Sequence, residues 1–206
     1  RKGLAVQCKK NKNITLIKNN TKSLSLTDIK IDHIYRGIIT ELVYLIMLEI
    51  VHSTIHILPE SPFHNNKYLT VLKLRRNEIQ HISPSAFHGL PNLMHLDISS
   101  NPLTHLSNMT FSMLPVVRRL IMSNTSIMVI PDDLFYFNLN LTFLDLNNTL
   151  LDTIAGIQPC RLSSLKALII SYTDIALRSF SNIDIKGCFP ALARLRVVES
   201  EICCLF

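Results

Sequence analysis

The sequence of 206 residues has no tryptophan, and only five of its residues are glycine. So little glycine argues against a flexible or low-complexity chain. No apolar run reaches the length that a transmembrane helix needs, so the sequence predicts no transmembrane span. The formal net charge is +6, but the positive residues form no polybasic run. We therefore expect a mildly basic surface and no binding to nucleic acid.

The amino terminus lacks the apolar core of a signal peptide, because the apolar stretch at residues 4–6 is too short. We therefore expect that the sequence is a piece of a longer protein. Apolar residues nevertheless make up 48% of it, and their order is regular.

The apolar residues recur with a fixed period, and the clearest copy runs from Leu72 to Leu90. Leu72 and Leu74 alternate with Lys73, as in a short strand with one buried face. The apolar residues that follow fill the space behind the strand, and they are Ile79, Ile82, Phe87 and Leu90. The other copies begin at evenly spaced leucines, except that the last comes slightly later than the period predicts: Leu24, Leu48, Leu96, Leu120, Leu144, Leu168 and Leu195.

A period of about 24 residues with this pattern is typical of the leucine-rich repeat. The predicted fold is an α/β leucine-rich-repeat solenoid, with a curved parallel β-sheet on the concave face and short helices or irregular turns on the convex face. We expect a partial amino-terminal flank at 1–23 and the repeats at 24–194. The segment 195–206 then holds the last repeat and the start of a carboxy-terminal flank or hinge.

One position, just after the second strand leucine, is polar in seven repeats. It holds Ser53, Asn77, Asn101, Thr125, Thr149, Thr173 and Ser200. A buried amide there bonds backbone groups of neighbouring turns, whereas a hydroxyl makes only one of these bonds. We therefore expect slightly looser turns in the carboxy-terminal half.

Six asparagines lie in Asn-x-Ser/Thr sequons: Asn13, Asn19, Asn108, Asn124, Asn140 and Asn147. This number favours an extracellular glycoprotein. The five cysteines agree, as disulfide candidates: Cys8, Cys160, Cys188, Cys203 and Cys204. Cys160 and Cys188, on the outer segments of consecutive repeats, form either a bridge across the convex side or two separate buried thiols. The odd number of cysteines predicts a partner cysteine beyond this sequence.

The segment from Phe189 to Phe206, FPALARLRVVESEICCLF, carries a more specific signal. Phe-Pro-x-Leu before a final strand, and then Cys-Cys-x-Phe, resembles the end of the repeat domain in leucine-rich-repeat-containing G-protein-coupled receptors. That group includes the receptors for glycoprotein hormones, R-spondins and relaxins. In the hormone and R-spondin branches, a Cys-Cys-Ala-Phe motif opens the hinge to the membrane bundle. Cys203, Cys204 and Phe206 match this motif, and Leu205 replaces its alanine. The spacing from Phe189 to Cys203 resembles the R-spondin-receptor branch.

We expect a ligand to bind the concave sheet, where three side chains of each repeat flank the strand leucines. Arginine and aromatic residues, which anchor many protein interfaces, occur near its middle with charges of both signs. The candidate binding residues are Lys73, Arg75, Arg76, Asp97, Arg119, Phe143, Asp145 and Tyr172. Alternatively, Glu49, Lys73 and Asp97 neutralise one another as a ladder across successive strands. A glycan on Asn147 would block the carboxy-terminal half of this face, so either binding shifts to the first four repeats or the sequon is unused.

The pattern does not favour catalysis or metal binding. Asp97 and Asp145 share a column but stand two strands apart, and a shallow sheet offers no pocket for paired carboxylates. The eight histidines are scattered, with no cysteine or carboxylate cluster beside them. We expect no enzyme activity, no metal and no cofactor.

With the resemblance, these features predict the extracellular ligand-binding domain of a membrane receptor, outside the plasma membrane. It would capture a secreted, hormone-like protein or peptide ligand. The first alternative is an adhesion, matrix or Toll-like leucine-rich-repeat protein that mediates protein–protein interaction. The second alternative is a purely structural secreted protein. The residues after Phe206 would distinguish the receptor from these alternatives, because seven apolar spans there would support the G-protein-coupled receptor.

Overall fold

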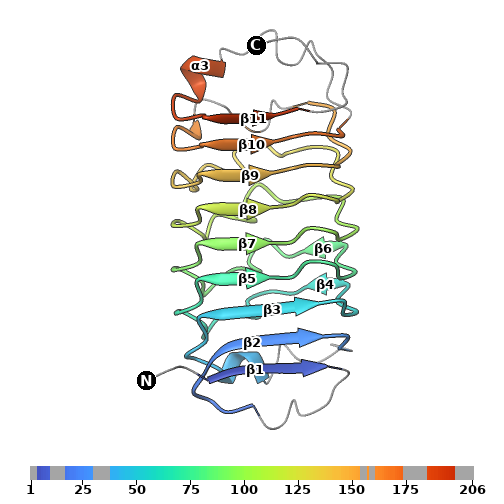
Figure 1. The fold of residues 1–206 in the computed structure, drawn as a ribbon, viewed down its shortest axis with the longest axis vertical. Helices are drawn as coiled ribbons and strands as arrows, with labels where there is room; N and C mark the ends of the chain where they lie inside the picture. Colours follow the sequence, from blue (N-terminus) through green and yellow to red (C-terminus); the bar gives the residue numbers. More distant parts are fainter. Residues whose placement is uncertain are drawn as a thin grey trace.

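The computed structural model describes residues 4–9, 17–29, 38–153, 157, 161–173 and 185–197. They form a solenoid in which successive turns each add one strand to a single sheet (Figure 1). The sheet has nine strands, all parallel, in the order β1-β2-β3-β5-β7-β8-β9-β10-β11. The predicted leucine-rich-repeat solenoid is therefore confirmed.

The strands of this sheet are short: β1 Leu4–Lys9, β2 Thr21–Thr27, β3 Met47–Val51, β5 Val71–Lys73, β7 His95–Asp97, β8 Arg119–Ile121, β9 Phe143–Asp145, β10 Ala167–Ile169 and β11 Arg194–Arg196. A second, two-stranded sheet pairs β4 (Ile57–Leu58) with β6 (His81–Ile82). The helices α1 (Ile38–Glu41) and α3 (Ile185–Cys188) have four residues each. Within the described residues, no helix has the length and apolar character needed to cross a membrane.

The leucines that start the repeats lie side by side on neighbouring strands. Leu72 of β5 is paired with Leu48 of β3 and with Leu96 of β7. The same step along the sequence holds from β2 to β10, and a slightly longer step brings Leu195 of β11 beside Leu168. A slip of one residue would turn these leucines out of the core. The period in the sequence therefore sets the register of the sheet.

Strand β1 lies within residues 1–23, where the period predicts no repeat, and it pairs with β2. Val6 and Cys8 lie beside Leu24 and Leu26, so they take the places of the two strand leucines. The step from Val6 to Leu24 is shorter than the step from Leu24 to Leu48, so a search at the period of the repeat misses it. The range assigned to a flank therefore contributes one further strand to the sheet.

Cys8 is a free thiol, and its side chain is buried in the core. Burial raises the pKa of this thiol. The disulfide predicted for Cys8 is thus not formed within this chain, and the residue packs as a small apolar side chain. Cys188 takes part in a disulfide bond. Because Cys160, Cys203 and Cys204 lie outside the described residues, the bridge from Cys160 to Cys188 stays a prediction.

The core is built from columns of identical or similar side chains. Behind the strand leucines, four buried phenylalanines follow one another at one per turn: Phe63, Phe87, Phe111 and Phe135. The ring centroids of Phe87 and Phe111 are 6.0 Å apart, and those of Phe111 and Phe135 are 6.2 Å apart, in stacked pairs. Such pairs contribute beyond the area that they bury.

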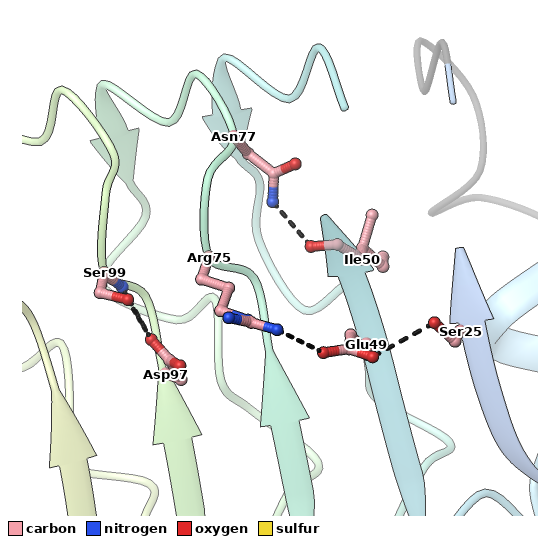
Figure 2. Close-up of polar contacts among 7 residues, drawn as sticks. All are labelled: Ser25, Glu49, Ile50, Arg75, Asn77, Asp97 and Ser99. Carbon is pink, nitrogen blue, oxygen red and sulfur yellow. Dashed lines mark hydrogen bonds and ion pairs between the residues drawn. The ribbon is translucent and has the colours of Figure 1, made fainter. Parts of the chain in front are cut away.

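The polar column forms the predicted bonds where it holds asparagine. Nδ2 of Asn77 donates to the carbonyl oxygens of Leu74, at 2.7 Å, and of Ile50 in the preceding turn, at 2.9 Å. Figure 2 shows the bond to Ile50. Oδ1 of Asn77 accepts the backbone N–H of Ser53 at 2.8 Å. One side chain thus satisfies buried backbone groups in two successive turns.

Further along the chain, this polar column changes from amides to hydroxyls. Asn101 also donates to its own turn and to Leu74 of the turn before. The hydroxyls that follow each donate to a carbonyl of the preceding strand end, within their own turn: Thr125, Thr149 and Thr173. These three hydroxyls make one bond of the amide set, as predicted. The Ser53 hydroxyl differs, because it donates to the carbonyl of Val51 and also accepts the N–H of Ile29 in the preceding turn.

In the nine-stranded sheet, each strand from β2 to β10 is followed by a residue with positive φ, between 52° and 56°, at intervals of one repeat: Asp28, His52, Arg76, Ser100, Asn124, Asn148 and Tyr172. This conformation is unfavourable for residues other than glycine. It is held by bonds to the next turn, since the N–H of His52 donates to the carbonyl of Arg76 at 2.9 Å. The turn carries Arg76 and Tyr172 past the end of the strand.

We predict that Asn77→Thr lowers the free energy of unfolding by about 1–3 kcal/mol. Threonine retains the bond within its own turn and can accept the Ser53 N–H, as the Ser53 hydroxyl accepts the N–H of Ile29. It has no second donor for the Ile50 carbonyl, and a buried unpaired group costs about 1–3 kcal/mol. Urea denaturation followed by circular dichroism measures the change.

The control is Thr149→Ser, which keeps the hydroxyl that donates to Leu146. It should lose no more than about 1 kcal/mol, for one buried methyl group. Equal losses in the two variants would contradict the role of the bonds between turns.

Candidate functional site on the concave face

The concave face is formed by the residues on either side of the strand leucine, which are the first and third residues of the three-residue strands. In β5, β8 and β9 these residues are partly exposed, whereas the middle leucine is buried. Parallel strands lie about 4.8 Å apart, so side chains in one column are close neighbours. One column contains Val71, His95, Arg119 and Phe143, and the other contains Lys73, Asp97, Ile121 and Asp145.

Glu49 of β3 is held by two side chains in the amino-terminal part of this face. Its Oε2 atom accepts the hydroxyl of Ser25 at 3.2 Å, and its Oε1 atom accepts Nη2 of Arg75 at 3.4 Å (Figure 2). The side chain of Glu49 is 18% exposed, so this ion pair is partly shielded from water. The amino-terminal part is therefore a fixed polar cluster.

The predicted ladder of Glu49, Lys73 and Asp97 is not formed. Glu49 pairs with Arg75 instead, because that longer side chain reaches across from the end of the next strand. The Asp97 carboxylate accepts the hydroxyl of Ser99 at 2.6 Å and its N–H at 3.0 Å (Figure 2). Among the described residues, Lys73 has no ion-pair partner. Lys73 is thus a partly exposed positive charge at the centre of the face.

Arg119 and Phe143 form the aromatic part of the site. They are paired on β8 and β9, and the guanidinium carbon of Arg119 lies 3.5 Å from the centroid of the Phe143 ring. A cation over an aromatic face at this distance is an attractive contact. Both side chains remain partly exposed. Among the described residues Arg119 forms no ion pair, so its donors are available to a partner.

His95, on β7, was missed among the candidate binding residues, although it lies one period before Arg119. Its Nε2 atom is buried and has no hydrogen-bond partner. Burial lowers the pKa of the imidazole, Arg119 and Lys73 lower it further, and Asp97 opposes them. His95 is therefore neutral at pH 7, between two cations.

Asp145 adds the opposite charge on β9. Burial raises the pKa of its carboxyl, whereas the N–H of Asn147, which donates at 3.0 Å, and the charge of Arg119 lower it. Asp97 raises the pKa of Asp145 too, although the two carboxylates stand two strands apart. The centre of the face thus combines both charges with an aromatic ring.

Two candidate residues do not join this centre. Arg76 and Tyr172 lie at the positive-φ turn that follows a strand, with φ of 55° at both. Tyr172 is half exposed, but it follows β10, far along the sheet from β5. The structure therefore gathers Lys73, Arg119, Phe143 and Asp145, and it leaves Arg76 and Tyr172 at the margin.

The sequons within the described residues are accessible. Exposed positions hold Asn19, Asn108, Asn124 and Asn140, and Asn147 is partly exposed beyond the end of β9. Asn13 lies outside the described residues. Within the described part of the chain, no three histidine, cysteine or carboxylate side chains come together as a metal site.

Comparisons with known proteins agree on the fold. The Leucine rich repeat family profile matches residues 67–127. No curated protein matches the sequence. Solved structures that are similar include the leucine-rich-repeat protein LIC12759 of Leptospira interrogans, with a TM-score of 0.69 and 22% identity. A chain of the Drosophila Toll–Spatzle complex has a TM-score of 0.72 and 23% identity, and an internalin (InlF) of Listeria monocytogenes has 0.58 and 16%.

These likenesses cover 85%, 87% and 91% of this chain, respectively. They cover only 44%, 23% and 63% of the three solved chains, so this chain spans less than two thirds of each. At such identities the likeness concerns the fold. The binding residues of this chain must therefore be argued from its own surface.

We predict that His95→Gln loses less stability than the unchanged protein when the pH falls from about 7.5 to about 5. The unfolded imidazole takes up a proton near its ordinary pKa of 6.5, and the folded one does so at lower pH. The unfolded state binds more protons in this window, so acid favours unfolding. Urea midpoints at both pH values measure the difference.

The control for this measurement is His105→Gln, which removes an exposed imidazole. It is measured at the same two pH values, so that only an effect specific to His95 counts. If the stability of the protein depends on pH identically with and without His95, the lowered pKa of this imidazole is refuted.

Asp145→Asn is expected to raise the free energy of unfolding at neutral pH. The raised pKa means that ionising this carboxyl costs folding free energy, while the amide oxygen still accepts the N–H of Asn147. The advantage should shrink as the pH falls towards 3.8, where the unfolded carboxyl is also protonated. Urea denaturation at neutral and acidic pH measures it. A less stable variant at neutral pH would mean that attraction by Arg119 outweighs burial.

Proposed function

We propose that this domain binds a secreted protein ligand on its concave face, as the extracellular part of a membrane receptor. The observation that supports this most directly is the Arg119–Phe143 pair, stacked at 3.5 Å and partly exposed in the middle of the sheet. Arginine and aromatic side chains are enriched among the residues that dominate binding energy. Lys73 and Asp145 would flank this anchor with opposite charges.

The shape of the site favours a protein over a small molecule. The candidate residues extend over the successive strands β5, β7, β8 and β9 rather than converging on one point. A surface of this kind fits the broad, flat contacts of protein interfaces. The similar chain from the Toll–Spatzle complex gives one example of the same fold in a protein complex.

The receptor group is the finer part of the proposal. It depends on the resemblance of the terminal Phe-Pro-x-Leu and Cys-Cys-x-Phe residues to leucine-rich-repeat G-protein-coupled receptors. Phe189 is buried against the core, just before β11, but Cys203, Cys204 and Phe206 lie outside the described residues. In such a receptor, binding would act through the hinge on the membrane bundle.

The alternative is an adhesion, matrix or Toll-like protein with the same repeats. Non-reducing peptide mapping of a longer secreted chain that continues past Phe206 separates the two. Pairing of Cys203 and Cys204 with cysteines downstream supports the hinge, whereas pairing with Cys160 or Cys188 makes them an ordinary cap.

We predict that Arg119→Ala with Phe143→Ala weakens ligand binding by about tenfold or more, the loss of one central anchor. The probes are recombinant cystine-knot hormones, R-spondin-like proteins and relaxin-like proteins, each titrated by biolayer interferometry. At least one should bind the unchanged domain saturably.

The matched control removes the same kind of contact from elsewhere on the solenoid. Arg161 lies 4.1 Å from the ring centroid of Tyr136, and both side chains are exposed. Arg161→Ala with Tyr136→Ala should leave affinity unchanged. If both double variants lose equally, the concave site is wrong. If no probe saturates, and Lys73→Glu with Arg75→Glu changes nothing, a purely structural role is the better account.

A further inference from the structure

A second surface lies along the edge where the chain rises into the strands. We define the ascending edge as the four residues that precede each of β3, β5, β7, β8, β9 and β10: residues 43–46, 67–70, 91–94, 115–118, 139–142 and 163–166. In Figure 1, these segments lead into the left ends of the arrows. None of them contains an aspartate or glutamate, whereas they contain Lys67, Arg118 and Lys166.

Backbone hydrogen bonds align the last residue of each segment with the next. The N–H of Thr70 donates to the carbonyl of Ile46 at 2.8 Å, that of Met94 to Thr70 at 2.9 Å, and that of Arg118 to Met94 at 2.9 Å. These residues therefore form one continuous column, about 4.8 Å per step. Side chains that are far apart in the sequence become neighbours along the edge.

The amino-terminal part of this edge exposes large apolar side chains. The rings of Tyr44 and Tyr68 stack with centroids 6.3 Å apart, and about half of each side chain is exposed. Nζ of Lys67 lies 5.3 Å from the Tyr68 ring. Ile46 and Met94 are about two-fifths exposed in the adjoining column. Apolar side chains that gather on a surface and are bordered by charge mark interaction sites more often than scattered ones do.

The charges on this part of the edge are all positive and unpaired. Among the described residues, neither Lys67 nor Arg118 has a carboxylate partner. Exposed carboxylates such as Asp28 and Glu78 follow the strands, and exposed Glu41 lies just outside the edge, at the end of α1. A partner with negative charge around an apolar centre would complement this arrangement, and one with positive charge would be repelled.

The sequons also leave this part of the edge open. Asn140 is the one sequon in the six segments, and its Nδ2 atom donates to the carbonyl of Pro115 at 3.0 Å. It therefore lies one turn beyond Arg118, at the border of the patch. A glycan there would cover the carboxy-terminal part of the edge and leave the tyrosines free.

We infer that the patch of Tyr44, Ile46, Lys67, Tyr68, Met94 and Arg118 binds an acidic protein segment with apolar residues between its carboxylates. The stacked tyrosines receive the apolar side chains, and Lys67 and Arg118 bind the carboxylates. This surface borders the concave centre at Arg118, and the inference does not depend on the ligand proposed for that centre.

The test uses a phage-displayed library of random short peptides, selected on the unchanged domain. Selected peptides should be rich in Asp and Glu together with Leu or aromatic residues. Tyr44→Ala with Tyr68→Ala, and separately Lys67→Glu with Arg118→Glu, should each weaken binding of the synthesised peptides by about tenfold or more. These side chains are exposed, so thermal melting should show unchanged folding.

Two matched variants complete the design. Lys166→Glu reverses a charge on the same edge, two turns beyond Arg118, and Arg119→Ala with Phe143→Ala removes the concave anchor; neither should affect the peptides. The inference would be overturned if the selected peptides lacked acidic residues, or if the tyrosine variant bound them as tightly as the unchanged domain does. Heparin binding that needs the cations but not the tyrosines would also overturn it. Dimerisation in sedimentation, lost in the tyrosine variant, would instead make the patch a contact between copies.

Discussion

Each turn of this solenoid depends on hydrogen bonds that its neighbours supply. A short strand cannot satisfy its own backbone groups or cover its own leucine, so a single turn has no stable fold. The bonds of Asn77 to Ile50 and Ser53 in the preceding turn show this dependence within one side chain. They require the turns to stack in one register, and the other features of the structure follow from that register.

The register determines the surfaces as well as the core. Any two residues separated by one repeat become neighbours, whether they point inward or outward. Inside, this produces the stack of Phe87 and Phe111. On the concave face it brings Arg119 over Phe143, and on the ascending edge it stacks Tyr44 on Tyr68. The side chains that meet on each face are therefore spaced one repeat apart in the sequence. A column of buried side chains stabilises the fold, and a column of exposed ones is available to a partner.

The sequence predicted the sheet well because its signal is the strand leucine, and burial tolerates little else there. It failed where the spacing or the conformation changed. Strand β1 was not predicted, because the step from Val6 to Leu24 is shorter than one repeat. Arg76 and Tyr172 looked like concave residues, but the positive φ at both positions turns the chain away at the end of the strand. The sequence signalled that conformation only in part, because aspartate, histidine and asparagine tolerate positive φ but the same column also holds arginine, serine and tyrosine.

Within the candidate site, the columns were predictable but the pairings were not. Strand register makes Lys73 the direct neighbour of Glu49, yet the carboxylate pairs with Arg75. Arg75 reaches the carboxylate from beyond the end of β5, and a one-dimensional pattern does not contain that geometry. His95 was overlooked for a related reason. Its setting near Arg119 and Lys73 follows from two neighbouring strands, and the charges of both lower the pKa of its imidazole.

The two proposed surfaces differ in the physics that they offer a partner. On the concave face, charges are partly buried and several are already bonded, as Glu49 and Asp97 are. Such fixed groups discriminate between partners, because a mismatched partner leaves them unpaired. On the ascending edge, the cations are exposed and have no carboxylate partner among the described residues, and charges of that kind mainly accelerate encounter. The surfaces meet where Arg118, on the edge, directly precedes Arg119, on β8. A protein attracted along the edge would therefore arrive beside the concave anchor, so one partner large enough to span both residues would gain rate from the first and specificity from the second.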